Sequence, residues 1–336
     1  MNALPAIYYS CTLPVNAGGE LVNFQHVNSL RKQGWRAFAL LDGGARVEVP
    51  SRPFSVPLVQ WGEHMVFSSQ DWLVVPEVTP PQTLAHLATL PCRVVVHNQN
   101  PFYTFRGFTD IEQMNSYGLA GGLCCSHFTR ETLENWGSTT DWQAVRPAVL
   151  PHFANAAQGV RRHRQIAFMP RKRPQEAVFL RQIFRGLFPQ HADVPWLEIS
   201  NMSRPQVAQA LAESLIFVSL SRDEGLGLPP LEAMAAACLV CGFDGGGGVE
   251  FAHAKNGLWV PEGNIEACAR AIAASLALDE VQQQARIAEG HATVAQFSES
   301  RFDSELDAAW RHLLADAAPG YRTVSATGDL LTRSAS

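Results

Sequence analysis

The sequence predicts an α/β protein built from two doubly wound, Rossmann-like domains that face a central cleft. Strand-like apolar bursts alternate with helix-like stretches along most of the chain, which has 336 residues, 46% of them apolar. Such alternation is typical of a parallel sheet with helices on both faces. Two domains fit this length better than one. Ligands of such sheets bind beyond the carboxyl ends of the strands.

In the first half of the chain, short apolar bursts predict strands, and longer stretches of mixed character predict helices. The predicted helices include residues 20–33 and 129–136. The predicted strands cover residues 6–11, 37–41, 72–75, 94–97 and 123–126, and residues 145–150 are also strand-like.

In the second half, Ala, Leu, Gln and Glu content predicts helices over residues 265–278, with Asn264 as N-cap, and over residues 281–297. A last helix, residues 301–315, spaces its apolar side chains as a core-facing helix does. Those side chains are Phe302, Leu306, Trp310 and Leu314. The predicted strands cover residues 166–169, 196–199, 215–220 and 239–241.

The best domain boundary lies in residues 151–164, which follow a strand-like segment and end in a run of basic residues. We therefore expect an N-terminal domain over residues 1–160 and a C-terminal domain over residues 161–300. Residues 319–336 are polar and are expected to form a frayed tail.

Charge and composition exclude several classes of protein. The net charge of -5 argues against a nucleic-acid binder that works by general electrostatic attraction. The chain has no apolar run long enough to span a bilayer and no secretory signal, so we expect a cytoplasmic protein. The basic residues within 161–173 leave contact with the anionic surface of the inner membrane open. Seven cysteines, an odd number, do not suggest a disulfide framework.

The most informative segment is a strand, a glycine-bearing turn and a helix opened by two prolines, residues 215–235. Glu224 lies in the turn, and Glu232 lies about one turn into the helix. The exposed N–H groups of a helix start favour an anion. Such a site can hold a diphosphate, with carboxylates on either side that accept hydroxyl hydrogen bonds. This describes a nucleotide-sugar pocket.

Residues 224–232, Glu-Gly-Leu-Gly-Leu-Pro-Pro-Leu-Glu, resemble the signature of the family-four retaining glycosyltransferases (glycosyl transferases group 1), and the likeness continues through 245–250 and 256–260. The resemblance implies the GT-B fold and transfer of a sugar from a nucleoside-diphosphate donor to a glycan or lipid-linked acceptor, in bacterial surface polysaccharide or glycoconjugate synthesis. It also implies that residues 1–160 serve the acceptor, that residues 161–300 bind the donor, and that residues 301–318 return to the N-terminal domain.

The resemblance further implies roles for individual residues. Glu232 would accept hydrogen bonds from the ribose hydroxyls, and Glu224 would orient the sugar. Backbone without side chains at Gly246 and Gly247 would approach the sugar or phosphate closely. The turn and helix start would line the same site through Gly225, Leu226, Gly227 and Leu228.

Other candidates carry weaker signals. Arg171 and Lys172 follow the strand at 166–169 and are expected to neutralise the leaving diphosphate, although a solvated linker patch also explains them. The family commonly has a lysine where Glu176 stands. Gly18 and Gly19 follow the first strand, where backbone can approach donor and acceptor. His97 ends a strand and is a candidate catalytic residue, with a purely structural role as the alternative. The predicted site residues of the first half are Gly18, Gly19 and His97.

In this family the leaving phosphate can assist the acceptor hydroxyl, so retention needs no protein nucleophile. The chain also lacks an Asp-x-Asp motif. We therefore expect no metal and no cofactor besides the donor substrate. A nucleotide-sugar epimerase or hydrolase of the same fold, and a non-catalytic nucleotide- or glycan-binding module, are the alternatives. The sequence leaves the oligomeric state open.

Overall fold

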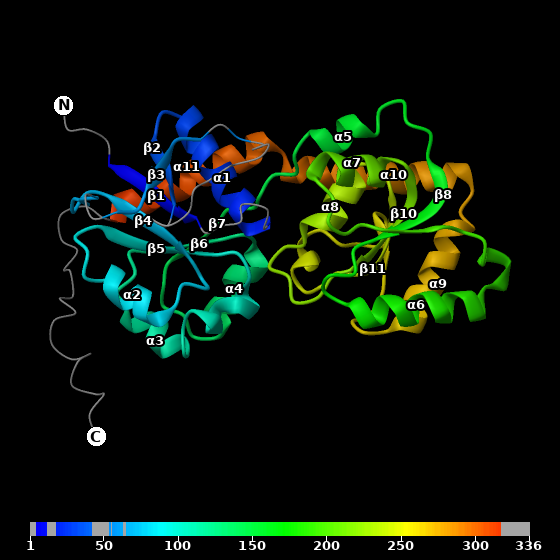
Figure 1. Cartoon of the computed structure of the whole chain (residues 1–336), viewed down its shortest axis with the longest axis horizontal. Coiled ribbons are helices and arrows are strands. Elements are labelled where there is room, and N and C mark those ends of the chain that lie inside the picture. The colour runs from blue at the N-terminus through cyan, green and yellow to red at the C-terminus, as the bar shows by residue number, and fades with distance from the viewer. Residues whose placement is uncertain (1–4, 12–17, 42–53, 55, 63–64, 317–336) are drawn as a thin grey trace, which may run out of the picture. The chain divides into compact units, whose positions relative to one another are not determined.

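The structure is a computed structural model that describes residues 5–11, 18–41, 54, 56–62 and 65–316. The chain forms two compact units (Figure 1). The second unit is Ala148–Arg301, and the first holds the described residues up to Pro147 together with the last helix from Phe302 onward. The boundary between the two units therefore lies before residue 148, ahead of residues 151–164, the segment in which we expected it. The reason is that the N–H of Val149 donates to the carbonyl of Phe297 at 2.9 Å, which ties the start of that segment to the second unit.

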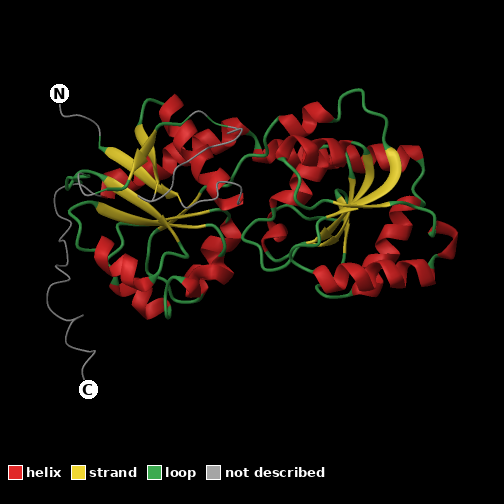
Figure 2. Ribbon diagram, viewed as in Figure 1, coloured by secondary structure: helices red, strands yellow, loops and turns green. Residues whose placement is uncertain are grey.

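The described residues of the first unit contain a parallel sheet with the strand order β3-β2-β1-β4-β5-β6-β7 (Figure 2). Helices α2, α3 and α4 cover one face, and α1 and α11 cover the other. The strands are β1 (Ala6–Cys11), β2 (Arg36–Leu41), β3 (Leu58–Gln60), β4 (Trp72–Pro76), β5 (Arg93–Asn98), β6 (Gly122–Cys124) and β7 (Trp142–Ala144). The helices are α1 (Gly18–Lys32), α2 (Pro81–Leu87), α3 (Ile111–Ser116), α4 (His127–Asn135) and α11 (Glu299–Asp316), with a short 3-10 helix η1 (Pro101–Arg106).

The second unit has a parallel sheet with the order β12-β11-β10-β8-β9. Helices α6 and α9 pack together on one face, and α7, α8 and α10 lie on the other (Figure 1). The strands are β8 (His163–Phe168), β9 (Trp196–Glu198), β10 (Ser214–Leu220), β11 (Leu239–Phe243) and β12 (Gly257–Trp259). The helices are α5 (His152–Ala156), α6 (Pro174–Leu187), α7 (Arg204–Ala212), α8 (Leu228–Ala235), α9 (Ile265–Leu276) and α10 (Glu280–Val294), with 3-10 helices η2 (Pro189–His191), η3 (Gly247–Glu250) and η4 (Ala295–Phe297).

Helix α11 is anchored to the first unit by buried aromatic side chains. The indole N–H of Trp310 donates to the Tyr9 hydroxyl at 3.1 Å, and its ring packs edge-on against Trp72 at 5.6 Å. Phe302 and Leu306 are buried as the helical spacing predicts, but Leu313 is the buried residue of the last turn. The expected Leu314 is only half buried.

Most predicted strands and helices are confirmed within a few residues of their ends. The prediction of a strand at residues 145–150 is wrong, because the chain leaves the sheet after β7 and Pro147 has no N–H to continue the ladder. Strands β3, β7 and β12, each of three residues, were not predicted. All seven cysteines are free and buried. No helix among the described residues is long and apolar enough to cross a membrane. The expected tail, 319–336, lies outside the described residues.

Candidate active site

Three neighbouring strands of the second unit deliver the predicted site residues to one edge of the sheet. Strand β10 lies between β8 and β11, and all three run parallel. Their carboxyl ends therefore lie together, which is where ligands of such sheets bind. Lys172 follows β8, Glu224 follows β10, and Gly246 follows β11. This places one candidate cation, one candidate carboxylate and the glycine run in the same region.

The turn after β10, residues 221–227, is the acidic turn of the site. Asp223 and Gly227 both have left-handed backbone, with φ of 49° and 88°. Helix α8 begins directly afterwards at Leu228, with Pro229 in its first turn, where a missing N–H costs no helical hydrogen bond. The acidic turn therefore projects Glu224 beside the start of α8, as the sequence predicts.

Glu224 lies beside the cation that we predicted from the end of β8. Lys172 Nζ lies 3.5 Å from Glu224 Oε1 and donates to the carbonyl of Asp223 at 3.3 Å. Burial raises the pKa of Glu224, and the charges of Lys172 and Arg171 act in the opposite direction. Arg171 itself is exposed. Lys172 thus contacts the acidic turn directly, whereas Arg171 acts on Glu224 through its charge alone, and their role at a diphosphate stays a prediction.

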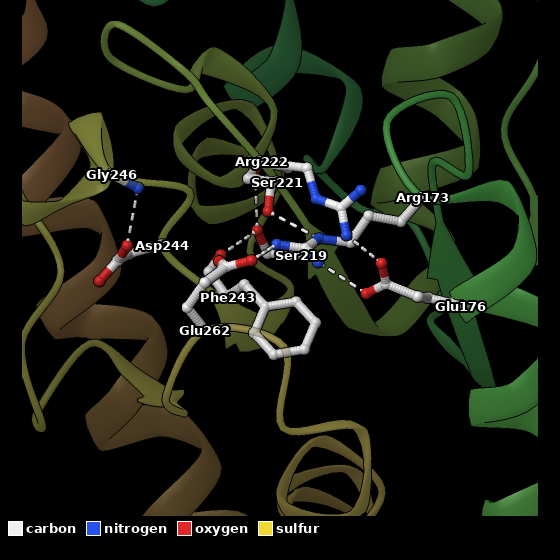
Figure 3. A network of polar contacts seen from close by, with 9 residues as sticks. All are labelled: Arg173, Glu176, Ser219, Ser221, Arg222, Phe243, Asp244, Gly246 and Glu262. Carbon is white, nitrogen blue, oxygen red and sulfur yellow. Dashed lines mark hydrogen bonds and ion pairs between the residues drawn. The ribbon is translucent and has the colours of Figure 1, made fainter.

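The glycine loop, residues 244–248, packs directly against the acidic turn. The N–H of Glu224 donates to Gly245 O at 2.9 Å, and the N–H of Gly247 donates to Glu224 O at 3.0 Å. A Cβ on Gly247 would lie only 2.3 Å from the carbonyl carbon of Gly225, so only glycine allows this approach. The N–H of Gly246 also donates within the protein, to Asp244 Oδ1 at 2.9 Å (Figure 3). The glycines therefore let the two loops interlock, a role that we did not predict.

The second predicted glutamate, Glu232, is buried on α8. Its Oε1 accepts a hydrogen bond from Nη2 of Arg204 at 2.9 Å, and Arg204 is the first residue of α7. Burial raises the pKa of Glu232, and the positive charge of Arg204 opposes this shift. A charge-assisted hydrogen bond of this kind holds the carboxylate in one orientation.

A buried arginine is hydrogen-bonded to the acidic turn (Figure 3). The Arg173 side chain is fully buried, and its Nε donates to the carbonyl of Ser221 at 3.1 Å. Nη1 of Arg173 bonds Glu176 at 2.6 Å, and Nη2 bonds Glu262. Arg222 also bonds Glu176. Where the family commonly has a lysine, Glu176 here holds two arginines in place.

The same arginine reaches the strand that leads into the glycine loop. Its guanidinium carbon lies 4.5 Å from the centre of the Phe243 ring, a cation–π contact. Ser219 Oγ donates to the carbonyl of Phe243 at 2.6 Å and contacts Ser221 Oγ at 3.1 Å. Arg173 and these hydroxyls therefore connect β10, β11 and the acidic turn into one support (Figure 3).

The predicted residues of the first unit come together around a buried histidine. His97, at the end of β5, makes a hydrogen bond from Nδ1 to Asn23 Oδ1 at 2.9 Å. Gln99 Nε2 joins the same oxygen at 3.3 Å and donates to the carbonyl of Gly19 at 3.1 Å. Gly18, the first residue of α1, is exposed. The structure thus links His97 to Gly19 through Asn23 and Gln99, and among these described residues it shows no hydrogen bond between this group and Gly18.

His97 is held neutral by its surroundings. Burial lowers its pKa to about 3, and its ring lies 4.6 Å from that of His26, whose pKa is also lowered by burial. His26 Nδ1 is 3.0 Å from the Tyr9 hydroxyl, which accepts from Trp310. The Nε2 atom of His97 is buried without a hydrogen-bond partner. A neutral imidazole with one free nitrogen can orient a polar group, and its catalytic role stays a prediction.

The acidic turn, helix α8 and the glycine loop lie in a region that matches a known family. The family model Glycosyl transferases group 1 matches residues 198–290, which include Glu224, Glu232 and the glycine loop. A curated relative, the Alpha-1,6-glucosyltransferase of Actinobacillus pleuropneumoniae serotype 7 (strain AP76), is 38% identical over 231 residues, covering 68% of this chain and 69% of that protein. The chain belongs to the glycosyl transferases group 1 family. It is a glycosyltransferase.

Solved structures of glycosyltransferases share its fold. Sucrose-phosphate synthase from Thermosynechococcus elongatus has a TM-score of 0.68 at 13% identity, covering 93% of this chain and 100% of that chain. The Anabaena protein HepE in complex with UDP has a TM-score of 0.69 at 12% identity, covering 91% and 100%. At such identities the likeness concerns the fold alone, and it confirms the expected GT-B fold.

Two arginines of this glycosyltransferase were not predicted as site residues. Arg173 directly follows the predicted site residues Arg171 and Lys172. Its spacing of three residues from Glu176, which is typical of an ion pair at a helix start, was the sequence feature that could have indicated it. Arg204 had no signal, because 28 residues separate it from Glu232. Among the described residues, no group of three or more His, Cys, Asp or Glu is arranged to hold a metal. Independence from metal stays a prediction.

Gly247→Ala should destabilise the second unit by about 1 to 3 kcal/mol, because the new methyl group overlaps the backbone of Gly225. Urea unfolding followed by circular dichroism measures this. Gly186→Ala is the matched control, since a Cβ there meets nothing within 4 Å and Gly186 lies in α6. Equal unfolding midpoints for Gly247→Ala and the wild type would contradict the interlocked loops.

Proposed function

We propose that this glycosyltransferase moves a hexose-like sugar, with retention of configuration and without a metal ion, from a nucleoside diphosphate to a glycan or lipid-linked acceptor. The observation that carries the proposal is the pairing of Glu224 with Lys172 at 3.5 Å beside the start of α8. Lys172 and Arg171 supply positive charge for a diphosphate, and Glu224 supplies an acceptor for sugar hydroxyls. Glu232, buried and oriented, would accept hydrogen bonds from the ribose.

The chemistry follows from these positions. The bond between the anomeric carbon and the phosphate oxygen breaks, and the acceptor oxygen bonds that carbon on the same face. The acceptor's proton passes to the leaving phosphate, whose growing charge Lys172 and Arg171 stabilise. The protein contributes orientation and charge rather than a nucleophile. The name of the curated relative, an Alpha-1,6-glucosyltransferase, supports glucose as the sugar, and the complex of HepE with UDP supports uridine as the nucleoside.

The direct test is release of nucleoside diphosphate from a panel of UDP-, GDP- and ADP-hexoses, with and without oligosaccharide and lipid-linked acceptors. We expect release that depends on acceptor, continues in EDTA, and yields an α-linked product by proton NMR of the anomeric centre. Release without acceptor would instead indicate an epimerase or hydrolase. Absence of donor binding by calorimetry would leave only a non-catalytic module.

The biological setting is also part of the proposal. A role in bacterial surface polysaccharide or glycoconjugate synthesis suits an acceptor of this kind. The location in the cytoplasm and contact with the inner membrane through the basic residues within 161–173 stay predictions. The oligomeric state stays open.

A further inference from the structure

Side chains from three helices form a cluster in which Arg204 joins the buried Glu232 carboxylate to Phe153. Arg204 begins α7, His152 and Phe153 belong to α5, and Glu232 belongs to α8. Helix α5 packs against both α7 and α8, so the cluster is an internal feature of the second unit. The proposed mechanism uses only Glu232 from this cluster, which leaves the function of Arg204 unexplained.

Arg204 is held in one place from two directions. Its Nη2 bonds Glu232 Oε1 at 2.9 Å, and its guanidinium carbon lies 5.3 Å from the centre of the buried Phe153 ring. The backbone before it is fixed as well, because Gln206 Oε1 accepts from the N–H of Ser203 at 2.8 Å. A planar guanidinium that stacks on a ring and bonds a carboxylate has little freedom left.

Two nitrogen atoms of the cluster have no partner in the protein. Arg204 Nε and His152 Nε2 are buried, and neither makes a hydrogen bond with another residue. An unpaired buried donor next to a charged group is unfavourable unless a ligand or water satisfies it. His152 lies close enough for the Arg204 charge to lower its pKa, after the larger effect of burial. These two nitrogens take no part in the contact between Arg204 and Glu232, which Nη2 makes.

We propose that Arg204 positions Glu232 for the two ribose hydroxyls of the donor and thereby determines selectivity for ribonucleotides over deoxyribonucleotides. The inference rests on the proposed function, because Glu232 must first be the ribose acceptor. Arg204 acts through Glu232: it occupies Oε1 and leaves the second oxygen to accept from a hydroxyl, and its positive charge opposes the rise in the pKa of Glu232 that burial causes. Arg204 is thus a positioning residue and takes no part in bond breaking.

The test compares binding of UDP and of 2′,3′-dideoxy-UDP by calorimetry, after a screen of the four common ribonucleoside diphosphates has identified the base that binds. If another base binds best, its pair of diphosphates replaces the uridine pair. We expect wild-type protein to prefer the ribonucleotide, and Arg204→Met to lose about tenfold in affinity for it, or about 1.4 kcal/mol. Affinity of this variant for the dideoxy analogue should change little. In turnover, KM for the donor should rise more than kcat falls.

Three further variants separate positioning from simple damage to the fold. Arg204→Lys should recover part of the preference, because it restores the charge without the planar fork. Arg204→Met should change nothing further in a Glu232→Gln background, since both act through one contact. Arg270→Met, which removes an exposed arginine of α9, should bind like the wild type.

The outcomes distinguish this inference from the proposed function. If no ribonucleoside diphosphate binds wild-type protein, the proposed function fails, and the inference fails with it. If one binds, but Arg204→Met keeps the full preference for the ribose or its effect adds to that of Glu232→Gln, only the inference is overturned.

Discussion

Glu224→Gln is expected to lower turnover by about 100-fold, which corresponds to the upper part of the range for a hydrogen bond to a charged group. The substitution keeps the volume of the side chain but removes the charge that faces Lys172 at 3.5 Å. If the proposed function is right, the sugar loses the carboxylate that accepts its hydroxyl hydrogen bonds, and Lys172 loses the negative charge that faces it. Initial rates of nucleoside diphosphate release, at saturating donor, measure the effect.

The matched control for this prediction is Glu266→Gln. Glu266 lies in the first turn of α9 in the same unit, is exposed and pairs with Arg270. Its loss should leave turnover within a factor of about two, because exposed ion pairs contribute little. Turnover by Glu224→Gln at more than half the wild-type rate would show that this carboxylate does not act on the donor.

Arg173→Met is expected to lower the free energy of unfolding of the second unit by about 3 kcal/mol. The buried guanidinium holds the Ser221 carbonyl and two carboxylates, of Glu176 and Glu262. Its removal leaves the Ser221 carbonyl and Glu176 Oε2 without these bonds, while Arg222 still pairs with the other oxygen of Glu176. Methionine fills much of the volume of the arginine side chain, so the loss of stability can be attributed to the missing charge and hydrogen bonds. Urea unfolding of the variant measures the difference.

Activity should fall along with stability in Arg173→Met, because the same side chain supports the acidic turn and the strand that leads to the glycine loop. Arg270→Met serves again as the exposed comparison and should stay within about 0.5 kcal/mol of wild type. An unfolding free energy of Arg173→Met within 1 kcal/mol of the wild type, a threshold below the expected range, would mean that the buried network is not a structural support.

Much of the candidate site in the second unit could be predicted from sequence because its signals are local. Glu224, Gly227 and Glu232 all lie within one turn-helix segment, and the family motif covers them. For Lys172, the sequence indicated only that the residue lies shortly after a strand. Its contact with Glu224 depends on β8 being the neighbour of β10, which is a property of strand order.

The interlocked loops and the contact of Arg204 with Glu232 could not be predicted, because they too depend on which elements are neighbours in the fold. Gly247, in the loop after β11, packs against Gly225 in the turn after β10. Arg204 begins α7 and bonds Glu232 on α8. The prediction of a strand at residues 145–150 was wrong because apolar composition does not show where a segment has no neighbouring strand to pair with. His97 was placed correctly at a strand end, but its burial beside His26 depends on how α1 packs on the sheet.

The proposed placement of the donor is tested most directly by a crystal structure of the full chain with a bound nucleoside diphosphate. We predict ribose hydroxyls within hydrogen-bond distance of the Glu232 carboxylate and phosphate oxygens beside Lys172 and Arg171. A nucleotide bound away from the acidic turn, or one that leaves both Glu224 and Glu232 untouched, would contradict the assignment of these residues.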